Sequence, residues 1–180
     1  MGEIKAFYPF KLVMGILISR MERKPELIEK LKGRFGGIDY ESGDFPFSFT
    51  DYYDGEMGGS IRRFFVSFSD LVNPESLADI KIETNGIEEI FSDGGMRRVN
   101  LDPGILSLSR FILATTKDNV HRIPLHKGIY AEVTLIYERH AFQDLPWTYA
   151  DFRSEANKAA LEHIRSLYKD QIRTLKKNSD

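Results

Sequence analysis

Cysteine is absent from this 180-residue sequence, which excludes a disulfide framework, a thiolate metal site and a cysteine nucleophile. Long apolar runs are absent as well. The longest, from Leu12 to Ile18, is far too short to span a bilayer. The first residues also lack a signal-type hydrophobic stretch followed by a small-residue cleavage site. From these absences we expect a cytoplasmic protein without a membrane-spanning segment.

The sequence has neither of the common phosphate-binding motifs, G-x-x-x-x-G-K-[ST] and G-x-G-x-x-G. Nucleotide binding through a P-loop or a Rossmann motif is therefore not expected. Thr116-Lys117-Asp118 has the residue types of the guanine-reading Thr-Lys-x-Asp motif, but its aspartate comes one position too early. The formal net charge of -2 gives no overall basic footprint, so nucleic acid is not an expected partner.

The remaining composition is that of an ordinary globular protein. Hydrophobic residues make up 42% and charged residues 29% of the chain, which leaves enough apolar side chains for a core without disulfides or metals. At this length, one domain spanning residues 1–180 is the simplest organisation. Nothing in the composition predicts an oligomeric state.

Apolar periodicity predicts the elements of the first half of the chain. Lys11 to Ser19 is a nearly continuous apolar run, typical of a central buried strand. Pro25 to Phe35 has apolar residues at helical spacing and ends before two glycines, so we predict a short helix. Alternating aromatic and polar residues predict strands at Asp44 to Tyr53 and at Ile61 to Ser69, joined by the loop Asp54 to Ser60.

The segment from Pro74 to Ser92 has two interpretations. It starts with an Asn-Pro helix signal and repeats apolar residues at intervals of three and four, which favours a helix. The alternative is a hairpin turning at Asn85-Gly86, because Asn-Gly is a strong turn signal and glycine costs about 1 kcal/mol inside a helix. We predict the helix.

The second half is predicted to extend the sheet and to end in a helix. Strands are expected at Arg97 to Asp102, Phe111 to Thr116, Val120 to Leu125 and Ile129 to Tyr137, the third of them an edge strand because of its proline. A long C-terminal helix follows, with Thr148 and Asp151 as its capping box. The fold class is therefore α+β, with a mainly antiparallel sheet, a ferredoxin-like βαββαβ start, a β extension and the C-terminal helix packed on one face.

We place the candidate site on the polar face of the sheet between Arg97 and Tyr137. Side chains alternate along a strand, so Arg98, Asn100 and Asp102 share one face of the first strand. Glu132 and Thr134 likewise share one face of the last strand. Asp102-Pro103-Gly104 is expected to end its strand in a turn that exposes backbone N–H groups. Such a face would bind an anionic, phosphorylated small molecule through charge-assisted hydrogen bonds.

The candidate residues fall into three roles. In catalysis, Asp102 or Glu132 would be a general base and His121 a general acid, with Arg98 or Arg122 holding the anion. A divalent cation would be held by Glu56, Asp102 and Glu132, although no fixed spacing supports this set. The full set of expected ligand-binding residues is Arg63, Arg98, Asn100, Lys117, Arg122 and Thr134. The competing interpretation is a solvated, salt-bridged sheet face, and whether the protein is an enzyme stays open.

The alternative function is a non-catalytic module that binds protein or RNA through an exposed sheet face. Its basis is Phe65-Val66-Ser67-Phe68, which matches the end of the RNA-binding motif [K/R]-G-[F/Y]-[G/A]-F-V-x-[F/Y]. The preceding residues, Ile61 to Phe64, do not match. Aromatic packing therefore explains this strand better than base stacking does.

Five phrases of the sequence resemble one protein family. They are TDYYDGEMG (Thr50 to Gly58), RRVNLDPG (Arg97 to Gly104), ATTKDNVHRI (Ala114 to Ile123), GIYAEVTLIY (Gly128 to Tyr137) and WTYADF (Trp147 to Phe152). The family is the uncharacterised prokaryotic domain of unknown function 4416, and the resemblance covers nearly the whole chain. It implies a single-domain cytoplasmic protein with no assigned activity, although some members are labelled GTP-binding.

The resemblance also implies which positions carry the family pattern. They are Tyr53, Glu56, Gly58, Arg63, Asn100, Asp102, Gly104, Lys117, His121, Arg122, Glu132 and Thr134. The chain departs from the pattern at two positions where the family commonly has tyrosine, with Ile105 after Asp-Pro-Gly and Pro124 after His-Arg-Ile.

Overall fold

Strand β1 (Phe10–Ile18) is the centre of the fold, as its continuous apolar run predicts. The computed structural model describes residues 2–50, 53–58 and 60–177. In it, β1 lies between β4 (Arg62–Val72) and β5 (Val99–Leu106) and pairs antiparallel with both. All of its residues after Phe10 are buried. A strand with neighbours on both edges and helices on both faces is apolar on both faces, which is why this run does not alternate.

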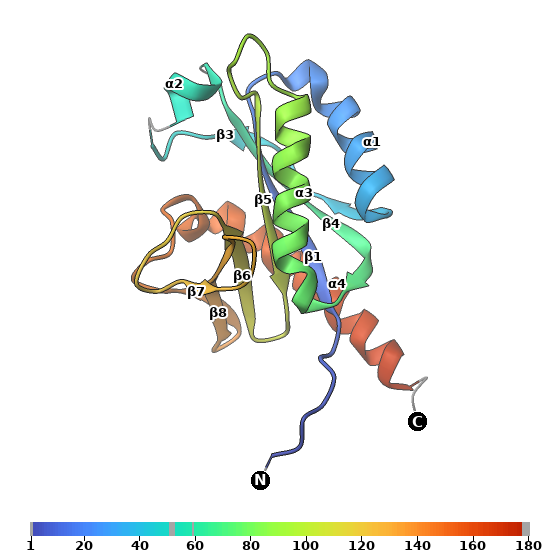
Figure 1. Ribbon diagram of the computed structural model, residues 1–180. Coiled ribbons are helices and arrows are strands. Elements are labelled where there is room, and N and C mark those ends of the chain that lie inside the picture. Colours follow the sequence, from blue (N-terminus) through green and yellow to red (C-terminus); the bar gives the residue numbers. More distant parts are fainter. Residues whose placement is uncertain (1, 51–52, 59, 178–180) are drawn as a thin grey trace.

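The other elements follow in chain order and are labelled in Figure 1. They are α1 (Lys24–Phe35), β2 (Ile38–Glu41), β3 (Phe45–Pro46), α2 (Asp54–Met57), β4, α3 (Leu77–Ile90), β5, β6 (Arg110–Thr115), β7 (Ile123–Pro124), β8 (Tyr130–Glu138), β9 (Ala141–Asp144) and α4 (Glu155–Lys177). Short 3-10 turns precede three of the helices, at Met21–Arg23, Pro74–Ser76 and Asp151–Arg153.

The strands form one nine-stranded sheet in the order β2-β4-β1-β5-β6-β8-β7, with β3 added to β4 and β9 added to β8. Each pairing in the described sheet is antiparallel. The first strand, β1, therefore lies between β4, which precedes α3, and β5, which follows it, and this order confirms the ferredoxin-like βαββαβ start. The predicted helix from Pro74 to Ser92 is confirmed as a 3-10 turn followed by α3, which ends at Ile90, so the hairpin alternative is wrong. β7 is an edge strand, as its proline predicts, but it is shorter than expected.

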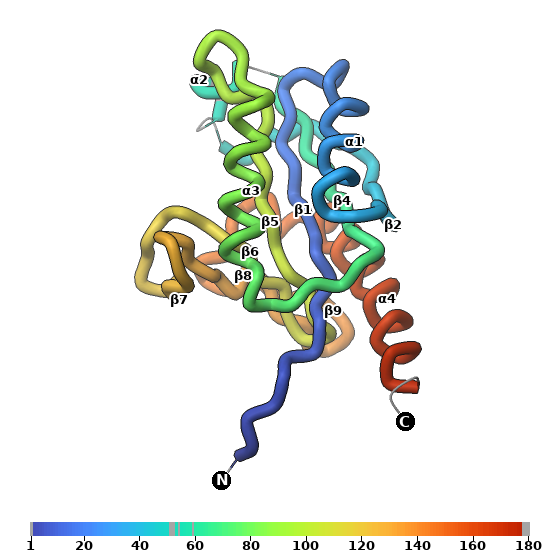
Figure 2. The backbone as a smooth tube through the Cα atoms, turned by 45° about the vertical axis from the view of Figure 1, so that its right-hand side comes forward, coloured from blue at the N-terminus to red at the C-terminus, as the bar shows by residue number. Residues whose placement is uncertain are grey.

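Helices cover both faces of the sheet. α1 and α3 pack on one face, where Leu31 and Ile80 meet Met14 and Ile16 of β1. The C-terminal helix α4 packs on the other face, where Leu161 joins a cluster that includes Val13 and Phe65, and Figure 2 shows it behind the sheet, opposite α1 and α3. No helix in the described ranges is long and apolar enough to cross a membrane.

The predicted strand from Asp44 to Tyr53 is largely wrong. Only Phe45–Pro46 forms a strand, and the partner of β4 before it is Ile38–Glu41. The alternating aromatic residues instead form a cluster, in which the ring of Phe47 lies 5.7 Å from Phe49 and 5.8 Å from Tyr53. The aromatic residues at every second position therefore reflect packing against one another and do not indicate a strand here. Part of the predicted strand, residues 51–52, lies outside the described residues.

The predicted turn at Asp102-Pro103-Gly104 is also wrong, because β5 runs straight through it to Leu106. Leu101, two residues before the proline, has its N–H and C=O turned away from β1, since both bond to α3 side chains. Pro103 therefore points its nitrogen to the same side. Pairing with β6 starts only at Gly104, so the missing N–H of Pro103 breaks no ladder bond.

The long C-terminal helix is confirmed, but its predicted capping box is wrong. The helix α4 starts at Glu155, and Ser154 caps it by accepting a hydrogen bond from the Asn157 N–H at 3.4 Å. Thr148 lies earlier and joins the sheet instead, because its hydroxyl donates to the Thr134 carbonyl at 2.6 Å. A 3-10 turn separates the two segments.

Candidate functional site

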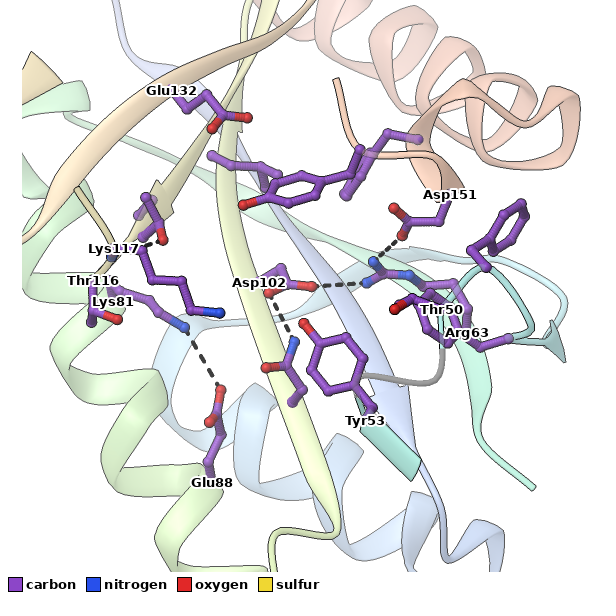
Figure 3. Close-up of a pocket in the computed structure, with 18 of the residues that line it drawn as sticks. Thr50, Tyr53, Arg63, Lys81, Glu88, Asp102, Thr116, Lys117, Glu132 and Asp151 are labelled. Atoms are coloured by element: carbon purple, nitrogen blue, oxygen red, sulfur yellow. Dashed lines mark hydrogen bonds and ion pairs between the residues drawn. The ribbon is translucent and has the colours of Figure 1, made fainter. Parts of the chain in front are cut away.

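A cavity of about 740 Å³ lies where β5 and β6 diverge (Figure 3). Because β6 pairs with β5 only over residues 104–106, residues 99–103 have β1 on one side and no β6 partner on the other. The wall is built from α2 and the segment before it, β4, α3, β5, the end of β6, β8 and the turn before α4. The charged side chains that line it are Glu56, Arg63, Lys81, Glu88, Arg97, Asp102, Lys117, Glu132 and Asp151. Phe47, Phe49, Tyr53, Tyr149 and Phe152 supply aromatic surface.

Two side chains of α3 occupy the free edge of β5. Lys81 Nζ donates to the Leu101 carbonyl at 2.8 Å, and the Leu101 N–H donates to Glu88 Oε1 at 2.7 Å. They replace the backbone partner that a neighbouring strand would provide, so both backbone groups of Leu101 are paired although β6 has diverged from β5 here. Burial raises the pKa of Glu88, against the opposing effects of Lys81, the Leu101 N–H and Arg97.

Arg63 of β4 holds two carboxylates at the floor of the cavity. Its side chain is only 3% exposed, and it donates to Asp102 at 3.0 Å and to Asp151. Asn100 donates to the other oxygen of Asp102 at 2.8 Å. Burial alone would lower the pKa of Arg63, but Asp151 and Asp102 outweigh it and the pKa is raised. The Asp102 carboxylate is thus fixed in orientation while 25% of its side chain remains exposed.

The carboxylate of Glu132 on β8 is hydrogen-bonded by two residues of the loop that precedes this strand, on the side away from the cavity. His121 Nε2 lies 2.9 Å from Glu132 Oε2, and Arg122 Nε donates to the same oxygen at 2.8 Å. His121 in turn stacks on Trp147, with ring centroids 5.0 Å apart, and Arg122 also donates to the Tyr149 hydroxyl. Burial raises the pKa of Tyr149, so its hydroxyl stays protonated in neutral solution.

Strand alternation predicts that Arg98 lines the cavity and that Arg97 does not, but the structure shows the reverse. Arg98 does not line the cavity, because its guanidinium lies against α2 and donates to the Met57 carbonyl at 2.9 Å. Arg97 reaches the cavity by folding around the free edge of β5, where it donates to Asn100 at 3.0 Å and to Glu88 at 3.2 Å. The strand begins only at Val99, so alternation does not determine where these two preceding side chains lie.

Comparison of the sequence with known protein families gives a match. Residues 8–168 match the family model described as Domain of unknown function (DUF4416). The chain belongs to the DUF4416 family. No curated protein and no solved structure matches it.

In this DUF4416 protein, the cavity brings together six of the ten candidate site residues that the sequence predicted. Those that line it are Glu56, Arg63, Asn100, Asp102, Lys117 and Glu132. His121 and Arg122 stand behind Glu132, so they would act on a ligand through that carboxylate. Thr134 is fully buried and does not reach the cavity.

The three carboxylates suggested for a divalent cation do not form a cluster. Glu56 is paired with Arg97, Asp102 with Arg63, and Glu132 with Arg122. In the described part of the chain, no group of three or more His, Cys, Asp or Glu side chains could hold a metal ion. A cation bound only by protein ligands is therefore not supported by this arrangement.

Among the ionisable side chains that line the cavity, sequence reasoning missed five. They are Lys81, Glu88, Arg97, Tyr149 and Asp151. Lys81 and Glu88 stand seven residues apart, so they share a face of α3, but nothing local distinguishes them from ordinary surface charges. Tyr149 and Asp151 fall within the phrase WTYADF of the family resemblance, which was the one available signal for them.

Proposed function

We propose that the cavity binds a small molecule that carries an anionic group, above all a phosphate. Its volume of about 740 Å³ falls within the range of small-molecule sites, which is roughly 300 to 1,000 Å³. The observation that carries the proposal is that three basic side chains line the same cavity, Lys81, Arg97 and Lys117. Lys81 and Lys117 extend into the cavity from the same side (Figure 3).

The cavity wall carries both positive and negative side chains, and their balance affects how strongly an anion can bind. Four basic side chains face five acidic ones, and Arg63, Lys81 and Arg97 each already contact a carboxylate. A bare phosphate would therefore meet repulsion as well as attraction. Mg²⁺ is commonly held by one or two carboxylates together with substrate phosphates. We therefore propose that a divalent cation accompanies the ligand, with one oxygen of the partly exposed Asp102 as a carboxylate ligand.

The test is a thermal-shift and calorimetric screen of sugar phosphates and nucleotides, each with Mg²⁺ and with a chelator. A ligand that binds only the folded state adds about 2.7 kcal/mol of stability at 100 times its dissociation constant. We expect at least one phosphorylated compound to stabilise the protein, and to do so less in Lys117→Ala. Lys169→Ala, which removes an exposed lysine of α4, is the matched control. No shift with the wild-type protein, or the same shift in Lys117→Ala, would refute the proposal.

Catalysis at this site would involve Asp102 or Glu132 as the general base. Both carboxylates line the cavity, and each is oriented by a neighbouring guanidinium. His121 is hydrogen-bonded to Glu132 but does not line the cavity, so it would set the orientation of that carboxylate. Whether a bound phosphate is transformed is answered by following it with ³¹P NMR in the presence of the protein.

The alternative function, an RNA- or protein-binding module, was based on an exposed Phe65-Val66-Ser67-Phe68 strand, but the aromatic side chains of this strand are not exposed. Phe65 and Phe68 of β4 are both fully buried in the core. They lie under α4 and under α1 and α3 respectively, so bases could not stack on them.

A further inference from the structure

One oxygen of Glu132 lacks a hydrogen-bond donor. The side chain is 1% exposed, and both of its donors, His121 and Arg122, are on Oε2. Oε1 is buried and has no partner among the described residues. Leaving a buried carboxylate oxygen unpaired is costly, and a donor from outside the chain, such as a water molecule or a ligand, would remove that cost. Glu132 lines the cavity, which is where such a donor would stand.

The surroundings of Glu132 favour a neutral donor over a cationic one. Arg122 has a side-chain exposure of 6% and already supplies a full positive charge to the carboxylate. An ammonium group beside this pair would add an uncompensated charge to a buried site. A hydroxyl group satisfies the oxygen without changing the charge.

Asp102 offers acceptors of the same kind on the floor of the cavity. Each of its oxygens receives one hydrogen bond, from Arg63 or from Asn100. A carboxylate oxygen accepts about two, so each oxygen keeps a free acceptor position. Glu132 lies on the same face of the sheet, because β5 pairs Gly104 with Leu113 of β6, and Leu113 pairs with Glu132. Glu132 and Asp102 therefore both present acceptor oxygens to the contents of the cavity.

We propose that the ligand is a phosphorylated polyhydroxyl compound of the sugar-phosphate class, whose hydroxyl groups donate to Glu132 and Asp102. This assignment rests on the proposed function, which places the phosphate near Lys81 and Lys117. The aromatic rings of Tyr149 and Phe152 line the same cavity and suit the C–H surface of such a molecule.

The experiment compares glucose 6-phosphate with n-hexyl phosphate by calorimetry, in the presence of Mg²⁺. Both carry six carbons and a phosphate monoester, but only the first has hydroxyl groups. We expect glucose 6-phosphate to bind at least about tenfold more tightly, since hydrogen bonds to a charged group are worth that much. In Glu132→Gln this preference should fall to less than about threefold, while the affinity for n-hexyl phosphate changes little.

The wild-type protein also provides a readout that needs no variant. Trp147 is the only tryptophan of the chain, and it stacks on His121, which contacts Glu132. Its fluorescence should therefore change with glucose 6-phosphate more than with n-hexyl phosphate. Equal binding and equal fluorescence changes for the two compounds would overturn this inference and leave the phosphate site intact. If neither compound binds, this inference also fails, and the screen of nucleotides and other phosphorylated compounds decides the proposed function separately.

Discussion

The guanidinium of Arg63 lies against Gly15, so closely that a β-carbon at position 15 would stand 2.9 Å from Arg63 Nη1. The sheet order explains the contact. Arg63 is on β4 and its partner Asp102 is on β5, and β1 runs between these two strands. Arg63 can span β1 only where that strand has no side chain on this face, and Gly15, which pairs with Asp102, leaves that space.

We expect Gly15→Ala to destabilise the protein, because the new methyl group would push Arg63 away from Asp102. Overpacking of this kind typically costs about 1 to 3 kcal/mol. Urea unfolding at constant m-value measures the loss. Gly33→Ala is the matched control, since nothing lies within 4 Å of its added carbon and it stands inside α1. That control should gain up to about 1 kcal/mol. Equal stabilities of Gly15→Ala and the wild type would show that Arg63 can move freely.

Replacing Arg63 itself tests the two ion pairs together. Arg63→Met would leave Asp102 and the buried Asp151 without their shared cation. Removing one partner from a buried charge network costs about 3 to 5 kcal/mol. Adding Asp151→Asn removes one of the two unpaired charges, so the double variant should recover part of the loss. A double variant less stable than Arg63→Met would mean that Asp151 is held by contacts other than Arg63.

The helix α3 gives a prediction that distinguishes the two interpretations of Pro74 to Ser92. Gly86 is exposed within α3, and nothing lies within 4 Å of an added β-carbon. Gly86→Ala should therefore raise the free energy of unfolding by about 0.5 to 1 kcal/mol through helix propensity. Gly94→Ala is the contrasting variant, because Gly94 has a φ of +57° and alanine is strained there. A destabilised Gly86→Ala would match the hairpin and contradict the helix.

The elements that sequence periodicity predicted correctly are those whose evidence is local. The apolar run of β1 and the helical spacing of α3 and α4 each record which faces are buried, and burial is repeated every two or three to four residues along the element. The errors arose where a tertiary partner overrode a local rule. Pro103 signals a turn on its own, but α3 supplies side-chain partners to the edge of β5, and the strand continues.

The cavity could be predicted only in part, because its contacts join distant segments. Arg63 meets Asp102 across 39 residues of sequence and Asp151 across 88. Alternation did place Asn100 and Asp102 on one face and Glu132 on the matching face of β8. It gave no information about α3 or the turn before α4, which complete the wall with Lys81, Glu88 and Asp151. Residues of this kind cannot be assigned to the cavity from local sequence patterns, because only the tertiary structure brings their segments together.

Glu88 provides a pH-dependent prediction at the free edge of β5. Burial raises the pKa of its carboxyl above the ordinary value of 4.5. Just above that pH, the folded protein retains a proton that the unfolded chain has already lost. The free energy of unfolding contributed by Glu88 therefore falls as the pH rises through this window. Glu88→Gln has no such proton, so the stability of the wild type relative to this variant should decline with increasing pH.

The measurement is a series of urea unfolding curves for the wild type and Glu88→Gln from pH 4.5 upward. Glu162→Gln, at an exposed position of α4, corrects for the change in net charge. Lys81 and Arg97 lie 3.7 Å and 3.2 Å from the Glu88 carboxylate and act in the opposite direction to burial. If the relative stability of the wild type rises with pH, these two ion pairs outweigh burial. In that case Lys81 and Arg97 hold the pKa of the Glu88 carboxyl below its value in the unfolded chain, and the direction predicted from burial is wrong.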